Sequence, residues 1–150
     1  MSGLSLETAL TIAGTAFATA RKRAAKPLCV VVLDSGGHVL VIQREETASL
    51  FRTAIARAKA TGALGMGMGS RAIADRAQQS PTFFASLSAV TDGQIAMAPG
   101  GVLIRDAGGA IVGAVGISGD TSDIDESCAV AGIEAAGLVA DPGAAPEGKA

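Results

Sequence analysis

Aromatic side chains and an excess of positive charge are both missing from this sequence. It contains no Trp and no Tyr, and only four of its 150 residues are Phe. Single-stranded nucleic acid is usually held by stacking its bases on aromatic side chains, so this scarcity argues against that function. The formal net charge is −2 and the pI is about 5.3, which disfavours duplex nucleic acid and anionic membranes as partners. A small molecule or another protein is the expected partner.

Histidine and cysteine are scarce as well, which removes several kinds of catalytic and metal site. His38 is the only histidine, and the two cysteines, Cys29 and Cys128, have no zinc-ligand spacing. Histidine-pair and cysteine-cluster metal sites are therefore excluded. A serine hydrolase is disfavoured because no G-x-S-x-G motif supplies a nucleophile. Both cysteines lie in apolar patterns, so we expect buried free thiols rather than a disulfide.

The sequence also lacks a long uninterrupted apolar run. The longest such stretch, residues 9–20, contains three threonines and a glycine, and basic residues follow it instead of preceding it. This pattern fits neither a membrane span nor a signal peptide. We therefore expect a cytoplasmic protein that does not bind membranes.

The charges that are present divide unevenly along the chain. Residues 1–80 carry ten basic and five acidic residues, a balance of +5, whereas residues 81–150 carry two and nine, a balance of −7. Two explanations stay open. The halves complement each other within or between subunits, or the basic half builds a site for an anionic ligand.

A repeated D-x-G-G motif indicates two β-hairpins. Asp34 begins the first motif and Asp106 begins the second, and each motif separates two runs rich in β-branched residues. These runs are residues 28–33 and 38–44 around the first motif, and residues 101–106 and 110–117 around the second. Hairpins imply antiparallel pairing, so the sheet is expected to be antiparallel.

Apolar residues at three- and four-residue spacing predict helices in most of the remaining chain. Ser5 is a suitable N-cap for the first helix, and Thr121 or Ser122 for the last. The stripes expected to face the core are Leu6, Leu10, Ala13, Phe17 and Ala20 in the first helix, Leu50, Ala54, Ile55 and Ala58 in the second, and Ile124, Cys128, Ala131, Ala135 and Leu138 in the last.

Together these elements predict an α+β fold. We expect an antiparallel sheet of about five strands with flanking helices, in which residues 94–98 form the fifth strand. One domain is expected over residues 1–140, followed by a disordered tail over residues 141–150 that is rich in Pro and Gly.

Glycines at the strand ends mark a place where a small ligand could approach the backbone. Gly100 and Gly101 lie where one strand begins, and Ser118 lies where another ends. If the two hairpins are neighbours, the basic side chains expected to line a concavity beside them are those of Arg44, Lys59 and Arg105. This arrangement predicts a small anion-binding pocket. It is equally open that these basic residues are ordinary surface groups.

Three other features have a functional and a structural interpretation. His38 is a candidate haem ligand or acid–base group, or else a solvent-facing residue beside a turn. Asp123 and Glu126, one helical turn apart, could bind iron or simply complement the helix dipole. The glycine–methionine run over residues 65–69 is a connection between helices or a poor copper(I) site.

Three segments of the sequence resemble the GlcG/HbpS family of haem-binding-like proteins, which also includes the C-terminal domain of PduO-type cobalamin proteins. These segments are residues 31–44, 56–61 and 99–126, and the likeness extends over about residues 4–139. The resemblance implies a five-stranded antiparallel sheet with a profilin-like or PAS-like layout, and a homo-oligomer. The sequence departs from the family pattern at Leu103, at residues 44–47 and in the glycine–methionine run.

Three hypotheses about function follow. The first is a small-molecule-binding protein, accessory to small-acid catabolism or redox stress, with haem or another tetrapyrrole as ligand and its propionates near Arg44 or Lys59. The second is an enzyme acting on a small hydroxy or oxo carboxylate, in which Arg44 or Lys59 holds the carboxylate and His38 or Lys59 moves a proton. The third is a structural oligomer without a ligand of its own.

Overall fold

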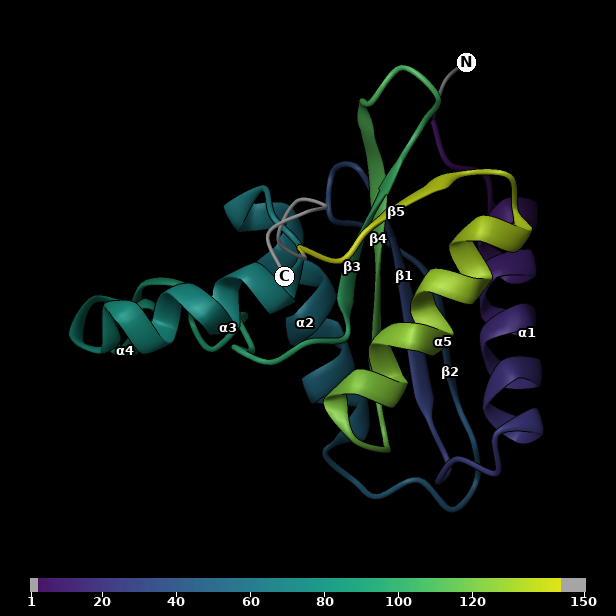
Figure 1. The fold of residues 1–150 in the computed structure, drawn as a ribbon, viewed down its shortest axis with the longest axis horizontal. Helices are drawn as coiled ribbons and strands as arrows, with labels where there is room; N and C mark the ends of the chain where they lie inside the picture. Colours follow the sequence, from purple (N-terminus) through teal and green to yellow (C-terminus); the bar gives the residue numbers. More distant parts are fainter. Residues whose placement is uncertain (1–2, 144–150) are drawn as a thin grey trace, which may run out of the picture.

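The computed structural model describes residues 3–143 and contains one antiparallel sheet covered by helices on both faces (Figure 1). The strands lie in the order β2-β1-β4-β3-β5, so the two hairpins are neighbours through the pairing of β1 with β4. The α+β fold is therefore confirmed. The strands are β1 Cys29–Asp34, β2 Val39–Arg44, β3 Gly101–Arg105, β4 Ile111–Ser118 and β5 Val139–Asp141.

The two D-x-G-G motifs form the same turn. In the first, one carboxylate oxygen of Asp34 accepts hydrogen bonds from the backbone N–H groups of Gly36 and His38, at 3.0 and 2.9 Å. Asp106 does the same at the second turn, where Gly108 and Ala110 are the donors. An aspartate that satisfies its own turn in this way is a strong local signal, which is why both hairpins are predictable from sequence.

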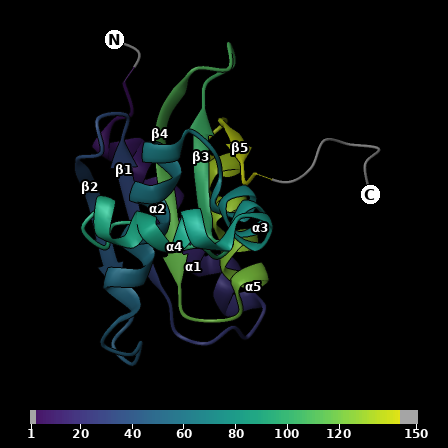
Figure 2. The ribbon, with the colours of Figure 1, turned by 90° about the vertical axis from the view of Figure 1, so that its left-hand side faces the viewer.

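Two layers of helix enclose the sheet. On one face lie α1 and α5, and on the other lies α2, with α3 and α4 beyond it (Figures 1 and 2). Ser5 caps α1 by accepting from the backbone N–H of Thr8, and Thr121 caps α5 by accepting from that of Ile124, so both N-cap predictions are confirmed. The helices are α1 Leu6–Lys22, α2 Arg52–Met66, α3 Ser70–Gln79, α4 Pro81–Val90 and α5 Ser122–Ala135. No helix in residues 3–143 is long and apolar enough to span a membrane.

The predicted strand over residues 94–98 is wrong. This segment is an irregular connection, and its Ile95 packs against Ile73, Phe84 and Leu87 in a small cluster between α3 and α4. The fifth strand is β5, which pairs with β3 after the last helix. Asp141 thus belongs to the sheet, one residue beyond the expected domain boundary, and residues 144–150 of the expected tail lie outside the described residues.

The faces that the helices turn to the core agree only in part with those predicted. Ala13, Ala20 and Cys128 are fully buried as expected, whereas the other predicted positions are partly buried or exposed. Leu6 and Leu10 of α1 are 54% and 45% exposed, while Ile12 and Ala16 are buried. In α2 the inward stripe is Ala56, Lys59, Ala60 and Ala63, and in α5 it is Asp125, Cys128, Ala129, Gly132 and Ile133. The physical reason is that these helices approach their neighbours closely through small residues. In an alanine-rich helix, the larger apolar side chains therefore do not mark the buried face.

Candidate functional site

Lys59 lies at the centre of a polar cluster where α2 crosses the sheet. Glycines allow this close crossing, because a Cβ atom at Gly116 would collide with the carbonyl oxygen of Ala56, and one at Gly101 with that of Lys59. The Lys59 side chain runs beside Gly100, where a Cβ atom would meet its Nζ at 2.7 Å. The predicted grouping of Lys59 with Gly100 and Gly101 is thus present, but its cause is packing of the helix on the strands.

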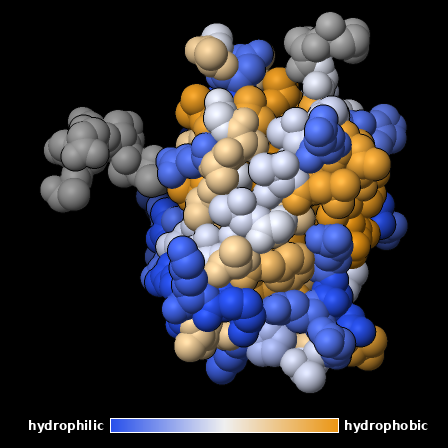
Figure 3. All heavy atoms as spheres, turned by 90° about the vertical axis from the view of Figure 1, so that its right-hand side faces the viewer, coloured by the Kyte–Doolittle hydropathy of each residue, from blue (hydrophilic) through white to orange (hydrophobic). Residues whose placement is uncertain are grey.

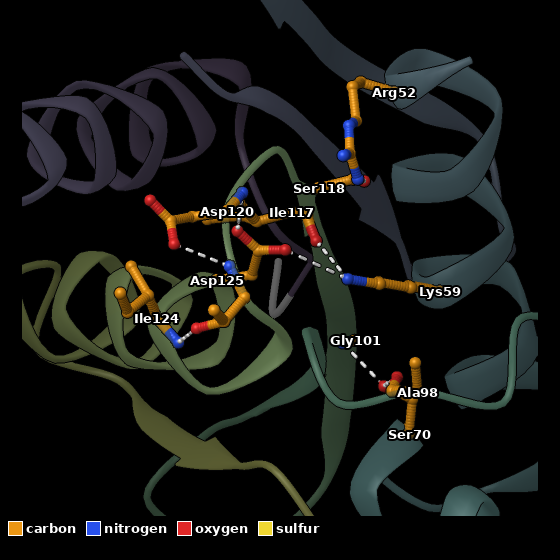
Figure 4. Close-up of polar contacts among 11 residues, drawn as sticks. Arg52, Lys59, Ser70, Ala98, Gly101, Ile117, Ser118, Asp120, Ile124 and Asp125 are labelled. Atoms are coloured by element: carbon orange, nitrogen blue, oxygen red, sulfur yellow. Dashed lines mark hydrogen bonds and ion pairs between the residues drawn. The ribbon is translucent and has the colours of Figure 1, made fainter. Parts of the chain in front are cut away.

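The Lys59 ammonium is buried together with a carboxylate. Only 3% of the lysine side chain and 1% of that of Asp125 are exposed, and the two are 3.2 Å apart, between Nζ and Oδ2 (Figure 4). Nζ also donates to the carbonyl oxygen of Ile117 at 2.8 Å, and the second oxygen of Asp125 accepts from the backbone N–H of Asp120. Lys59 therefore joins α2 to the end of β4 and the beginning of α5.

Burial acts on both members of this pair. It lowers the pKa of Lys59 and raises the pKa of Asp125, because each charged form loses hydration, while the charge of each partner works in the opposite direction. The nearby guanidinium of Arg52 also lowers the pKa of Lys59. Because only 3% of the lysine side chain is exposed and its ammonium is already paired with Asp125, we place Lys59 beneath the site rather than in contact with a ligand.

Arg52 lies above the cluster and lines a small hollow at the end of β4. Its Nη1 donates to the buried hydroxyl of Ser118 at 3.1 Å (Figure 4). The hollow has a volume of about 190 Å³, and we call it the basic recess; its lining residues are Lys26, Pro27, Thr47, Ala48, Ser49, Arg52 and Gly119. Ser118, predicted as a ligand-binding residue, therefore accepts a hydrogen bond from Arg52 and helps to fix the position of this guanidinium beside the recess.

Arg44 shapes the loop that borders the recess. Its Nη1 donates to the carbonyl oxygens of Glu45, Glu46 and Ala48 at 2.8 to 3.1 Å. Because the guanidinium is used to hold this loop, Arg44 contributes to the site by positioning its wall. Arg105 is not part of the site, since it lies at the opposite end of β3 and pairs with Asp141 at 2.9 Å.

A second hollow runs along the outer side of α2. Two adjoining cavities of about 320 and 270 Å³ share Thr61 and Gln94 in their lining, and we call their combined surface the α2 groove. The helix contributes one stripe at three- and four-residue spacing, which is Ala54, Arg57, Ala58, Thr61, Gly62, Gly65 and Met66. The connection after α4 forms the other wall with Val90, Thr91, Asp92, Gly93, Gln94 and Ile95.

His38 lines neither hollow. Its side chain is 82% exposed at the first hairpin turn, and its Nδ1 is 3.2 Å from the carboxylate of Asp34. The opposite end of β2, at Arg44, is about 17 Å along the strand from Val39 at the usual rise per residue. The structure therefore does not bring His38 together with Lys59 or Arg44, as the form of the enzyme hypothesis in which His38 moves the proton requires.

Asp123 and Glu126 face an arginine. Nε of Arg71 is 2.9 Å from Glu126, and Nη2 of the same guanidinium pairs with Asp123. Within residues 3–143 no group of three or more His, Cys, Asp or Glu side chains is placed to hold a metal ion. The structure therefore makes this acidic pair the partner of Arg71, in place of the iron-binding role considered from the sequence. Cys29 and Cys128 are buried free thiols, as expected.

Several important residues were not singled out by sequence. Asp125 is flanked by the acids Asp123 and Glu126, and their order alone does not show which carboxylate turns inward. Arg52 and Arg57 look like ordinary helix-surface residues. A usable signal existed for Asp125, because it lies three residues before the buried Cys128 and therefore falls on the same stripe of the helix.

The fold and these hollows define the class of molecule: an α+β protein with one antiparallel sheet and surface cavities the size of a small molecule. A family model described as "Haem degrading protein HbpS-like" matches residues 4–134. The chain therefore belongs to the HbpS-like family, which confirms the resemblance seen in the sequence. Comparison with curated proteins finds no match.

Solved structures with the same fold include HbpS itself, at 28% identity and a TM-score of 0.77, covering 89% of this chain and 90% of that one. The Klebsiella pneumoniae protein ORFY has 25% identity and a TM-score of 0.81, with the same coverage of 89% and 90%. PduOC, solved as a haem complex, has 24% identity and a TM-score of 0.82, covering 91% of this chain and 96% of that one. At this identity the likeness to PduOC shows the fold alone.

Proposed function

We propose that this protein binds haem, or a related tetrapyrrole, in the α2 groove. Membership of a family described as haem degrading supports haem as the ligand, and PduOC was solved with haem on the same fold. The observation that carries the choice of site is the groove itself. Its larger cavity of about 320 Å³ falls at the lower end of the range for small-molecule pockets, and the adjoining cavity extends it along the helix.

The chemistry of the groove suits a flat, mainly apolar ligand with acidic groups at one edge. One end is lined by Met66, Val90 and Ile95, and Gly65 leaves room for a flat ring, since nothing lies within 4 Å of the place where its Cβ atom would be. Arg57 lines the other end and is exposed, so its guanidinium is free to hold a carboxylate in a charge-assisted hydrogen bond. This assignment replaces the expected roles of Arg44 and Lys59 as propionate partners.

An axial ligand, if the protein supplies one, has to come from the groove lining. Among the described residues that line it, Met66 alone carries a thioether, and none is a histidine, cysteine or tyrosine. A thioether is an established haem ligand in cytochromes. The groove is also open to solvent, which fits shallow binding better than a deeply enclosed cofactor. When bound, haem would supply redox-active iron, while this chain binds and orients the ring.

Haemin titration of the purified protein tests this proposal. We expect a saturable shift of the Soret band at micromolar protein, lost in Thr61→Trp, which fills the middle of the groove. Arg57→Gln should weaken binding about 10-fold or more by removing the charged partner of a propionate. Arg76→Gln, an exposed cation on α3 outside the groove lining, is the matched control. Unchanged binding in Thr61→Trp would show that haem, if bound, lies elsewhere.

We also propose that the chain forms a homo-oligomer through the exposed face of α1. Leu6 and Leu10 are exposed on this helix, and apolar side chains gather on the face of the molecule that carries α1 and α5 (Figure 3). Neighbouring exposed apolar groups commonly mark an interface. Light scattering should therefore give a mass above that of a monomer, reduced in Leu6→Ser/Leu10→Ser but not in Phe83→Ser, which changes an exposed apolar residue on α4. A monomeric wild type would overturn this part.

A further inference from the structure

We propose that the basic recess binds a small oxyanion, such as a short carboxylate or inorganic phosphate, at a site separate from the α2 groove. The recess and the groove share no lining residue. Arg52 belongs to the stripe of α2 that includes Ala56 and Lys59, whereas the groove uses the stripe that includes Arg57 and Thr61. The two sites therefore lie on different sides of the same helix.

Arg52 is the observation from which the proposal starts. Among residues 3–143, four cationic side chains are buried or half-buried: Arg52, Lys59, Arg71 and Arg105. Lys59, Arg71 and Arg105 each have a carboxylate within 4 Å, but within residues 3–143 Arg52 has none and donates only to the neutral hydroxyl of Ser118. A half-buried guanidinium with no anionic partner, at the surface of a cavity, is placed to receive one from solution.

Two carboxylates within two residues of the recess lining, those of Asp120 and Glu45, are already used by the backbone. Asp120 accepts from the backbone N–H groups of Lys26 and Thr121, both at 2.7 Å. Glu45 accepts from the backbone N–H of Leu28 at 2.7 Å and pairs with Arg21. Neither of these carboxylates forms an ion pair with Arg52 in the described residues.

The lining of the recess supplies the other contacts that an oxyanion needs. Lys26 adds a second cation, and the side chains of Thr47 and Ser49 add hydroxyl donors. Arg44 fixes the loop that carries Thr47 by holding the carbonyl oxygens on either side of it. A volume of about 190 Å³ is too small for a tetrapyrrole but admits a short carboxylate or a phosphate ion.

The buried pair beneath the recess strengthens this inference. Arg52 and Lys59 are close enough for the arginine charge to lower the pKa of the lysine, and Asp125 is the one carboxylate in contact with Lys59 among the described residues. Two positive charges therefore share a single buried negative charge. An anion bound to Arg52 compensates the second positive charge, so binding there is favoured electrostatically.

Amide chemical shifts measured by NMR, with oxalate, inorganic phosphate or chloride added at equal ionic strength, test the proposal. We expect saturable shifts at Ser49, Arg52 and Gly119 with oxalate, phosphate or both, and none with chloride. The anion that binds more tightly identifies the carboxylate or the phosphate as the preferred class. Calorimetry with the same anions should show binding about 10- to 100-fold weaker in Arg52→Gln, since a charge-assisted contact is lost.

Matched variants separate this site from the haem proposal. Arg57→Gln removes a cation from the same helix but on the groove side, and it should leave anion binding unchanged. Lys26→Gln, at an exposed residue, should weaken anion binding without altering the fold. Arg52→Gln should leave haemin binding unchanged, so either proposal can fail alone. An equal response to chloride, shifts confined to other residues, or the same loss in Arg57→Gln would overturn the recess as an oxyanion site.

Discussion

Lys59 of α2 and Asp125 of α5 form an ion pair across the end of the sheet, with 3.2 Å between Nζ and Oδ2 and almost no exposure of either side chain. The two residues are 66 positions apart in the chain. The two helices lie on opposite faces of the sheet, so the ion pair connects these faces at the end of β4, where Lys59 also donates to the carbonyl oxygen of Ile117.

Removing one member of this pair should destabilise the protein strongly. Asp125→Asn leaves the Lys59 ammonium buried without a counter-charge, for which the expected cost is about 3–5 kcal/mol in the free energy of unfolding. Lys59→Met/Asp125→Asn removes both charges and should cost less than the sum of its single variants. Urea denaturation measures these values. Arg105→Gln, which breaks a partly exposed pair, is the control and should cost about 1 kcal/mol or less.

The crossing of α2 over β4 depends on the absence of a side chain at Gly116. Gly116→Ala would place a methyl group against the backbone of Ala56, and we expect a loss of about 1–3 kcal/mol in the free energy of unfolding. Gly14→Ala is the matched control, because this exposed glycine of α1 has nothing within 4 Å of its added Cβ. Alanine favours the helix there and should stabilise by about 0.5–1 kcal/mol. Thermal unfolding that ranks these variants in the opposite order would contradict the close crossing.

Asp120 should make stability fall in acid. The backbone N–H of Lys26, and after it that of Thr121, lowers the pKa of this carboxyl below the ordinary value of 3.8. In that pH range the unfolded chain binds more protons than the folded one, so the free energy of unfolding decreases as the pH falls from above 3.8 through the lowered pKa. Asp120→Asn should flatten this part of the pH profile relative to wild type.

His38 should be dispensable for haem binding. Its side chain lies in solvent at the tip of the first hairpin and lines neither cavity of the α2 groove. His38→Ala should therefore give the same haemin titration and the same Soret position as the wild type. A displaced Soret band in this variant would identify His38 as an axial ligand and would place the haem at the hairpin instead of the α2 groove.

Much of the fold was predictable because its signals are local. Asp34 and Asp106 each satisfy their own turn, and Ser5 and Thr121 each cap the helix that follows them. Each of these contacts joins residues within four positions in the chain, so the pattern of residues alone is sufficient to indicate it. Membership of the family followed in the same way from short segments that keep their order along the chain.

The candidate site was less predictable because its contacts connect distant segments. Lys59, Gly100 and Gly101 were correctly grouped, but the partner of Lys59 was not found, since three acids lie within four residues and only one of them turns inward. The strand expected at residues 94–98 failed for a similar reason. Ile95 is buried against α3 and α4. The alternation of apolar and polar residues over 94–98 does not indicate whether the apolar ones pack against helices or belong to a strand.

The sequence by itself determined the hairpins, the capped helices and the antiparallel pairing of the sheet. Only the tertiary structure decided which helix faces are buried, that Lys59 pairs with Asp125, and that Arg52, beside an open recess, contacts a hydroxyl and no carboxylate of the described residues. The physical reason is the small size of the residues at the packed faces. Alanine and glycine let helices and strands approach closely, but they give little contrast in hydrophobicity, so the geometry of their contacts appears only when the chain is folded.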